Sequence, residues 1–182
     1  MNLPNKLTML RVCMIPFFIF FLLSANIEYS NYIACGIFIA ASLTDWFDGY
    51  LARKHNLVTN FGKFMDPLAD KLLVSSALIC FVSMDSIKLP AWIVIVIISR
   101  EFIISGFRLI ASDNGVVIAA SYWGKFKTVS QMIMSILLII HYDNSAFHVA
   151  EQIFIYISVI LTIVSLIDYI AKNRNVLSEG SK

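Results

Sequence analysis

Four aspartates stand in two pairs within a strongly apolar chain. Asp45 and Asp48 are three residues apart, and Asp66 and Asp70 are four residues apart. Either spacing places two carboxylates on one face of a helix. Carboxylates near a membrane are costly unless something neutralises them, and divalent cations prefer such hard oxygen ligands. The pattern therefore predicts metal-assisted chemistry at a membrane surface.

Small residues and an arginine accompany the first pair. On a helix of 3.6 residues per turn, the residues of this face are Asp45, Asp48, Gly49, Ala52 and Arg53. Glycine and alanine have almost no side chain, so a ligand or another backbone can approach closely. Two carboxylate pairs can hold two divalent cations and leave positions for substrate oxygens, which suits phosphoryl-type transfer. Helix caps or surface acids explain a single aspartate, but they do not require small residues at fixed offsets.

The remainder of the sequence is typical of an integral membrane protein. Of the 182 residues, 59% are hydrophobic and 14% are charged, whereas a soluble domain carries about 25% charged residues. The apolar segments are Val12–Ala25, Tyr32–Thr44, Leu72–Met84, Ala91–Ile110, Val129–His141 and Phe147–Ile170. Several are shorter than the roughly 20 residues of a spanning helix, but each can be lengthened through its polar flanks. We therefore predict an all-α bundle of six transmembrane helices that forms a single domain, residues 1–182.

The expected helix boundaries depend on the polar flanks. The second helix should continue through Asp45 to about Arg53. The third should begin near Pro67, with Asp66 as its N-cap, because proline is favoured at the first helical position. The amphipathic stretch Asn2–Arg11 is expected to form a short interfacial helix on the membrane surface.

Lysine and arginine residues are strongly biased to one side of these predicted spans. That side collects Lys6, Arg11, Arg53, Lys54, Lys63, Lys71, Arg108, Lys125, Lys127, Lys172, Arg174 and Lys182, and the other has Lys88. By the positive-inside rule, both termini and the aspartates lie on the cytoplasmic side of the cell membrane. The net charge of +2 gives no sign of a nucleic-acid partner.

Four further basic residues suit a phosphorylated substrate. Arg100 and Arg108 are about 80° apart around a helix, so they can face one pocket. Lys125 and Lys127 stand at the predicted cytoplasmic start of the fifth helix. Such a cluster favours a phosphate, to which arginine gives bidentate contacts. Two alternatives stay open: the lysines can be positive-inside anchors, and Arg100 can form a structural pair with Glu101.

The histidines and cysteines are not expected to form a site. His55, His141 and His148 show no partner at metal-binding spacing, and solvated or interfacial side chains explain them. The three cysteines lie far apart in apolar runs, which predicts small buried side chains with free thiols.

The complete acid pattern, D-x2-D-G-x2-A-R-x8-G-x3-D-x3-D, ends at Asp70. It resembles the signature of the CDP-alcohol phosphatidyltransferase family, six-helix membrane enzymes that displace CMP from a CDP-linked lipid with an alcohol. The segments Leu3–Thr8, Asn56–Phe64 and Ser99–Phe102 also resemble the bacterial phosphatidylglycerophosphate synthases within this family. The resemblance extends to about Thr128 and is weak beyond it.

The resemblance implies a role for each residue of the acid pattern. The ligands of two divalent cations, Mg²⁺ or Mn²⁺, would be Asp45, Asp48, Asp66 and Asp70. Asp70 would also be the general base. The residues that bind the donor, CDP-diacylglycerol, would be Gly49, Ala52, Arg53, Asn5 and Thr8.

The expected reaction is transfer of the phosphatidyl group to glycerol 3-phosphate, with release of CMP. The acceptor phosphate would be bound by Arg100, Arg108, Lys125 and Lys127. Phosphatidylglycerol (giving cardiolipin), inositol phosphate or serine are alternative acceptors, although the basic cluster disfavours serine. A divalent-cation transporter is an alternative of another class, but an ion path would not favour Arg53 beside the acids. Because family members form homodimers, we expect a homodimer.

Overall fold

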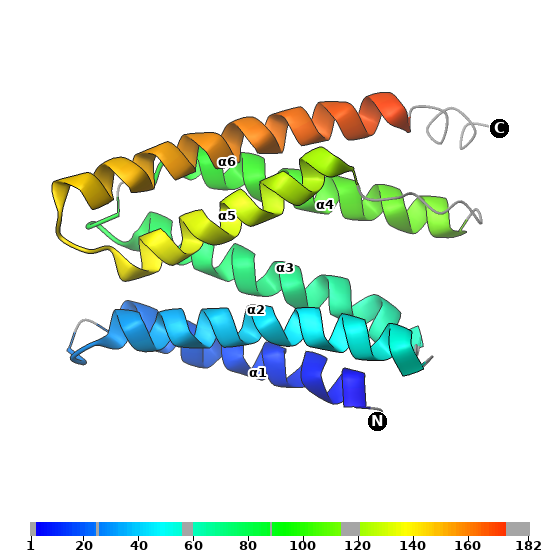
Figure 1. Ribbon diagram of the computed structural model, residues 1–182, viewed down its shortest axis with the longest axis horizontal. Helices are drawn as coiled ribbons and strands as arrows, with labels where there is room; N and C mark the ends of the chain where they lie inside the picture. The colour runs from blue at the N-terminus through cyan, green and yellow to red at the C-terminus, as the bar shows by residue number, and fades with distance from the viewer. Residues whose placement is uncertain (1–2, 25, 56–59, 88, 114–120, 174–182) are drawn as a thin grey trace. The chain divides into compact units, whose positions relative to one another are not determined.

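The computed structural model describes residues 3–24, 26–55, 60–87, 89–113 and 121–173. Within these ranges the chain forms six α-helices and no strand (Figure 1). The helices are α1 (Leu3–Leu23), α2 (Ser30–His55), α3 (Asn60–Ser83), α4 (Ala91–Asp113), α5 (Tyr122–Ile140) and α6 (Ser145–Lys172). Each predicted apolar segment therefore corresponds to one helix, and the all-α class is confirmed.

Two of the described helices contain an apolar stretch long enough to cross a membrane. These stretches are Lys6–Leu23 in α1 and Ser145–Lys172, the whole of α6. The apolar parts of α2 and α3 are shorter, Ser30–Thr44 and Lys71–Ser83. The long polar continuations of α2 and α3 carry the aspartate pairs.

The N-terminal stretch is not a separate interfacial helix, contrary to prediction. Helix α1 runs from Leu3 to Leu23 without a break and includes Pro16. Its polar start packs into the protein, since Thr8 and Arg11 are fully buried. The first apolar segment therefore continues directly from the stretch that was expected to lie on the membrane surface. Proline is tolerated in membrane-spanning helices because neighbouring groups satisfy the freed backbone carbonyl, and α1 contains one of the candidate spans.

Helix α3 begins earlier than predicted. It starts at Asn60, so Asp66 is not an N-cap and Pro67 lies within the helix. A proline inside a helix loses one backbone hydrogen bond. Helix α2 ends at His55, close to the predicted end at Arg53. Both aspartate pairs consequently stand on helical backbone.

The helices divide between two compact units. The first comprises Met1–Lys88 and Ser135–Tyr142, and so contains α1, α2, α3 and the end of α5. Helix α1 packs against α2 and α3, which also contact each other (Figure 1). Phe18 of α1 and Phe38 of α2 are fully buried in this interface, with ring centroids 5.7 Å apart. This aromatic pair is worth about 0.5–1.5 kcal/mol beyond the area that it buries.

The three cysteines all belong to this first unit and carry free thiols, as predicted. Cys35 and Cys80 are buried, whereas Cys13 is exposed. The burial prediction is therefore wrong for Cys13. An apolar segment has an outward face as well as a packed face, and Cys13 lies on the outward face of α1.

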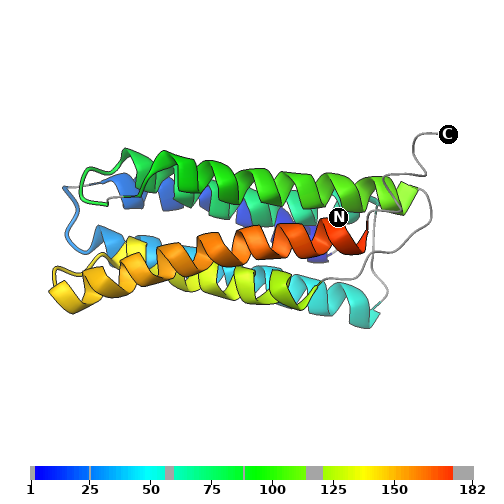
Figure 2. The same ribbon diagram turned by 90° about the horizontal axis from the view of Figure 1, so that it is seen from above.

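The second unit comprises Leu89–Met134 and Asp143–Lys182, and so contains α4, most of α5 and α6. Helix α4 packs against α6, which is an uninterrupted helix in Figure 2. The side chain of Asn144 caps α6 by accepting a hydrogen bond from the Ala146 amide at 2.9 Å. On the buried face of α6, Thr162 donates to the Ser158 carbonyl at 2.6 Å, and Ser165 donates to the Thr162 carbonyl at 2.9 Å. These hydroxyls are satisfied by their own helix, so they can be buried at low cost.

Candidate functional site

The first unit brings the two aspartate pairs to one end. The start of α1, the end of α2 and the start of α3 lie together there (Figure 1). Asp45 and Asp48 belong to the C-terminal part of α2, and Asp66 and Asp70 to the N-terminal part of α3. Their side chains lie outside the described residues. The backbone alone therefore places both pairs at the same end of neighbouring helices.

The buried positions of α2 lead directly to its aspartates. Ala34, Phe38 and Ala41 are fully buried at spacings of four and three residues. The same spacing, continued, reaches Asp45 and then Asp48. Residues at these intervals share one stripe along a helix. The first aspartate pair thus occupies register positions on the stripe that packs within the unit.

The buried positions of α3 lead to the second pair in the same way. Ala69 and Leu73 are buried, and Asp66 and Asp70 each precede one of them by three residues. Positions three apart are neighbours on a helix surface. The stripe of α3 that packs within the unit therefore also runs into an aspartate pair.

Arg11 is a residue at this end that the sequence patterns did not assign to the site. It is fully buried, and its Nε donates a hydrogen bond to the Ala41 carbonyl of α2 at 3.2 Å. Ala41 precedes Asp45 by four residues, so its carbonyl is also the helical acceptor for the Asp45 amide. An arginine at the edge of an apolar segment is typical of a membrane anchor. That position gave no signal for burial.

The residues expected to bind the donor lie on the same helices. Thr8 is fully buried on α1. Gly49, Ala52 and Arg53 lie near the end of α2, and Asn5 lies near the start of α1. Apart from Thr8, the side chains of this group lie outside the described residues. The helices therefore gather the expected donor residues at the end of the unit that carries the aspartates.

Two of the four basic residues expected to bind the acceptor form a buried network in the second unit. Arg100 of α4 and Lys127 of α5 are buried. Both pair with the same carboxylate oxygen of Glu101, with Arg100 Nη1 at 3.1 Å. Arg100 Nε also donates to the Ser165 hydroxyl of α6 at 3.1 Å. The network therefore links all three helices of this unit.

Space around Arg100 depends on a glycine of α5. A Cβ atom added at Gly124 would lie 3.3 Å from Arg100 Nη2, closer than most such contacts. By contrast, a Cβ added at Gly106 of α4 would meet nothing within 4 Å. The absence of a side chain at Gly124 thus lets the guanidinium lie against α5.

The other two basic residues are exposed. Arg108 lies on α4 and Lys125 on α5, and the Lys125 ammonium is 5.4 Å from the centroid of the Tyr122 ring. The pair of Arg100 with Glu101, the structural alternative that the sequence left open, is present. A guanidinium has five N–H donors, so this pair does not use the whole hydrogen-bonding capacity of Arg100.

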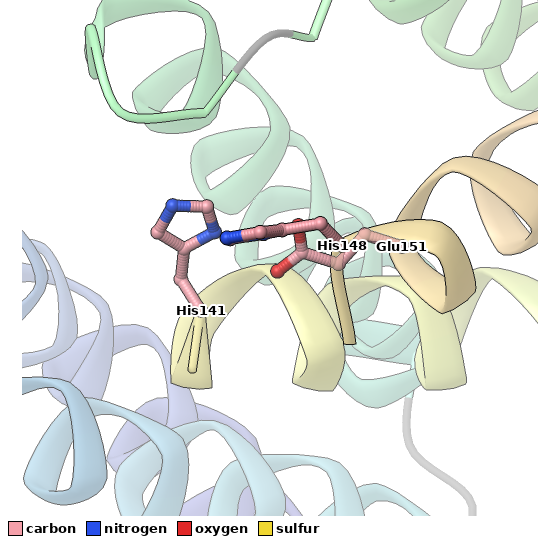
Figure 3. Close-up of side chains that lie close together, drawn as sticks. All are labelled: His141, His148 and Glu151. Carbon is pink, nitrogen blue, oxygen red and sulfur yellow. The ribbon is translucent and has the colours of Figure 1, made fainter. Parts of the chain in front are cut away.

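His148 has a partner that the sequence analysis missed. Its Nδ1 lies 3.2 Å from Oε2 of the buried Glu151 (Figure 3), and its Nε2 lies 3.7 Å from Asp143 Oδ1. The prediction of no partner at metal-binding spacing is wrong here, because residues three apart on α6 are neighbours. His141, which Figure 3 also draws, belongs to the first unit.

The sequence was compared with known proteins. It matches the family model for CDP-alcohol phosphatidyltransferase over residues 1–164. This match includes the whole acid pattern and continues past Thr128, where we had expected the similarity to weaken. Members of this enzyme family depend on divalent cations in general.

Three bacterial relatives are similar to the chain over most of their length, and each is named CDP-diacylglycerol–glycerol-3-phosphate 3-phosphatidyltransferase. The protein from Bacillus subtilis is 45% identical, with 99% of each chain covered. The protein from Haemophilus influenzae is 45% identical over 93% of this chain and 91% of its own. The protein from Rickettsia typhi is 38% identical over 92% of this chain and 94% of its own. On the family match and these identities, the chain belongs to the CDP-alcohol phosphatidyltransferase family.

Proposed function

We propose that this enzyme transfers the phosphatidyl group of CDP-diacylglycerol to glycerol 3-phosphate, giving phosphatidylglycerophosphate and CMP. The observation that carries the proposal is that relatives similar over nearly the whole chain bear the name of this reaction. Membership in a family of enzymes is the reason to prefer a transferase over a divalent-cation transporter.

The aspartate carboxylates at the end of the first unit are suitable ligands for divalent metal ions. Two carboxylate pairs on contacting helices offer hard oxygen ligands, which suit Mg²⁺ and Mn²⁺. We infer that two cations are held by Asp45, Asp48, Asp66 and Asp70. When bound, such cations stabilise negative charge that develops on phosphate oxygens.

The proposed reaction is a substitution at phosphorus. The acceptor hydroxyl oxygen bonds to the phosphorus attached to diacylglycerol, the bond from that phosphorus to the CMP oxygen breaks, and CMP leaves with the electron pair. Asp70 accepts the hydroxyl proton. Because a free aspartate has a pKa of about 4, this transfer requires a hydroxyl acidified within the site.

The donor is proposed to bind at the end of α2. Gly49 and Ala52 would leave space for the cytidine, and Arg53 would contact the diphosphate, for which a guanidinium is well suited. Asn5 and Thr8 would close the donor site from α1. The burial of Thr8 supports a position for this residue inside the proposed donor site.

The acceptor phosphate is proposed to bind the basic residues of the second unit. Arg100 and Lys127 are held by Glu101, which orients both cations before a ligand arrives. Arg108 and Lys125 are exposed and accessible to a soluble phosphate ester. Charge-assisted hydrogen bonds to phosphate are roughly twice as strong as neutral ones, so this set favours glycerol 3-phosphate over serine.

We further propose that all six helices span the cell membrane in a single domain. The two long apolar helices and the bacterial relatives support a place in a bacterial cell membrane. The bias of lysine and arginine supports cytoplasmic termini and a cytoplasmic active site. Homodimer formation is an expectation that comes from the family.

The test is release of CMP by the purified protein in detergent, given CDP-diacylglycerol and Mn²⁺ or Mg²⁺, with acceptors offered one at a time. Release with glycerol 3-phosphate alone, lost on chelation, is the expected result. Release with phosphatidylglycerol, inositol phosphate or serine instead would overturn the acceptor. A folded protein that releases no CMP with any acceptor would overturn the proposed reaction.

A further inference from the structure

The packed face of α1 changes character along its length. Its buried residues are Thr8, Arg11, Ile15, Phe18 and Leu22, at alternating spacings of three and four. The last three are apolar and pack in the manner of an ordinary core. The first two are polar, and they lie at the end of the unit to which α2 and α3 bring the aspartate pairs.

A hydrogen bond from Arg11 to α2 reaches the turn that precedes Asp45. Arg11 Nε donates to the Ala41 carbonyl at 3.2 Å. In an α-helix this carbonyl also accepts the amide of the residue four positions later, which is Asp45. The Arg11 guanidinium thus holds the carbonyl that accepts the hydrogen bond of the Asp45 amide, and Asp45 is a candidate metal ligand.

Packing alone does not explain an arginine at this position. A charged side chain buried in an apolar helix is costly, and an aliphatic residue would fill the same stripe without that cost. The same end of the unit carries four aspartates, and a cation is favoured over an aliphatic residue near such a concentration of negative charge.

We propose that Arg11 is a positioning residue for the metal site: by holding the Ala41 carbonyl, it fixes the turn of α2 that carries Asp45. The inference rests on the proposed function, since it takes the aspartates as metal ligands. Removal of residues that orient metal ligands, without binding the metal themselves, typically lowers metal affinity. In this role Arg11 acts through the backbone of α2 and not on the reacting atoms.

The experiment compares three variants of the full chain in detergent: Arg11→Met, Arg11→Lys and Phe18→Leu. The measurement is Mn²⁺ binding without substrate, by electron paramagnetic resonance, alongside the Mn²⁺ concentration for half-maximal CMP release. Arg11→Met should weaken Mn²⁺ binding by about tenfold to a hundredfold. Arg11→Lys should lose less, because an ammonium can still donate to a carbonyl but lacks the guanidinium fork.

Phe18→Leu is the matched control. It loosens the same interface between α1 and α2, at the contact with Phe38, and keeps the arginine that donates to the Ala41 carbonyl. It should lower the melting temperature and leave Mn²⁺ affinity unchanged. An equal loss of Mn²⁺ affinity in Phe18→Leu would overturn the proposal in favour of general packing.

Two outcomes separate this inference from the proposed function. Wild-type Mn²⁺ affinity in folded Arg11→Met would overturn the role of Arg11 and leave the reaction intact. Absence of Mn²⁺ binding in the wild-type protein would overturn the metal site itself. If Arg11→Met does not fold, Arg11→Lys decides, and unchanged Mn²⁺ affinity in that variant overturns the proposal.

Discussion

Glu101 of α4 and Lys127 of α5 form an ion pair within the second unit, and the same carboxylate oxygen binds Arg100. One carboxylate therefore holds two of the cations that we assign to the acceptor phosphate. The four basic residues proposed to bind the acceptor phosphate therefore divide into two kinds. Glu101 positions the buried side chains of Arg100 and Lys127. The side chains of Arg108 and Lys125 are exposed and accessible to an arriving ligand.

Replacing Glu101 by glutamine should impair acceptor binding more than donor binding. The amide cannot pair with two cations, so Arg100 and Lys127 lose their common anchor. We expect the KM for glycerol 3-phosphate to rise by about tenfold and stability to fall by roughly 1–3 kcal/mol, the usual cost of an unsatisfied buried group. Steady-state kinetics with each substrate varied in turn measures this. An unchanged acceptor KM in a folded variant would contradict the positioning of these cations by Glu101.

Replacing Gly124 by alanine should disturb Arg100 directly. The new Cβ would lie 3.3 Å from Arg100 Nη2, so the guanidinium must shift. We expect a rise of a few-fold, on the order of 1 kcal/mol, in the acceptor KM. Gly106→Ala is the matched control because its Cβ meets nothing within 4 Å. It should leave the acceptor KM unchanged and stabilise α4 by about 0.5–1 kcal/mol.

Replacing Asp70 by asparagine should abolish turnover in a protein that still folds. A general base contributes about 10²–10⁴-fold to rate, and loss of a metal ligand adds to that deficit. CMP release and the melting temperature are the two measurements. Asp85→Asn is the control, since Asp85 is exposed beyond the opposite end of α3. Wild-type turnover in Asp70→Asn would remove Asp70 as the base.

Replacing Arg108 by alanine should affect the acceptor selectively. Loss of a charge-assisted contact to phosphate costs about 1.5–3 kcal/mol, which corresponds to a rise in the acceptor KM of roughly tenfold or more. Lys6→Ala removes another exposed cation, from α1, and should leave the acceptor KM unchanged. Equal changes in the donor and acceptor KM values of Arg108→Ala would contradict its assignment to the acceptor.

The sequence predicted the helices and the aspartate pairs because both depend on local spacing. Apolar runs locate helices, and carboxylates three or four residues apart share a face once the helix is known. Boundaries were less predictable. Asp66 followed by Pro67 is typical of a helix start, yet α3 already begins at Asn60. Local preference at one dipeptide did not outweigh helix formation by the residues before it.

Contacts between helices were the part that spacing could not predict. The partners Glu101 and Lys127 are 26 residues apart, and Arg11 and Ala41 are 30 residues apart. Nothing in either local pattern distinguishes a buried arginine from one that anchors a helix at the membrane surface. Such partners become visible only when the packing of the helices is known.

The outward position of Cys13 gives the unmodified protein a single accessible attachment point for a probe. The other two cysteines are buried, so a thiol-directed nitroxide should label one position in detergent without any mutagenesis. That position lies on α1 only two residues beyond Arg11. Because a paramagnetic ion broadens the signal of a nearby nitroxide, the native thiol would report the distance between the first helix and Mn²⁺ at the proposed metal site.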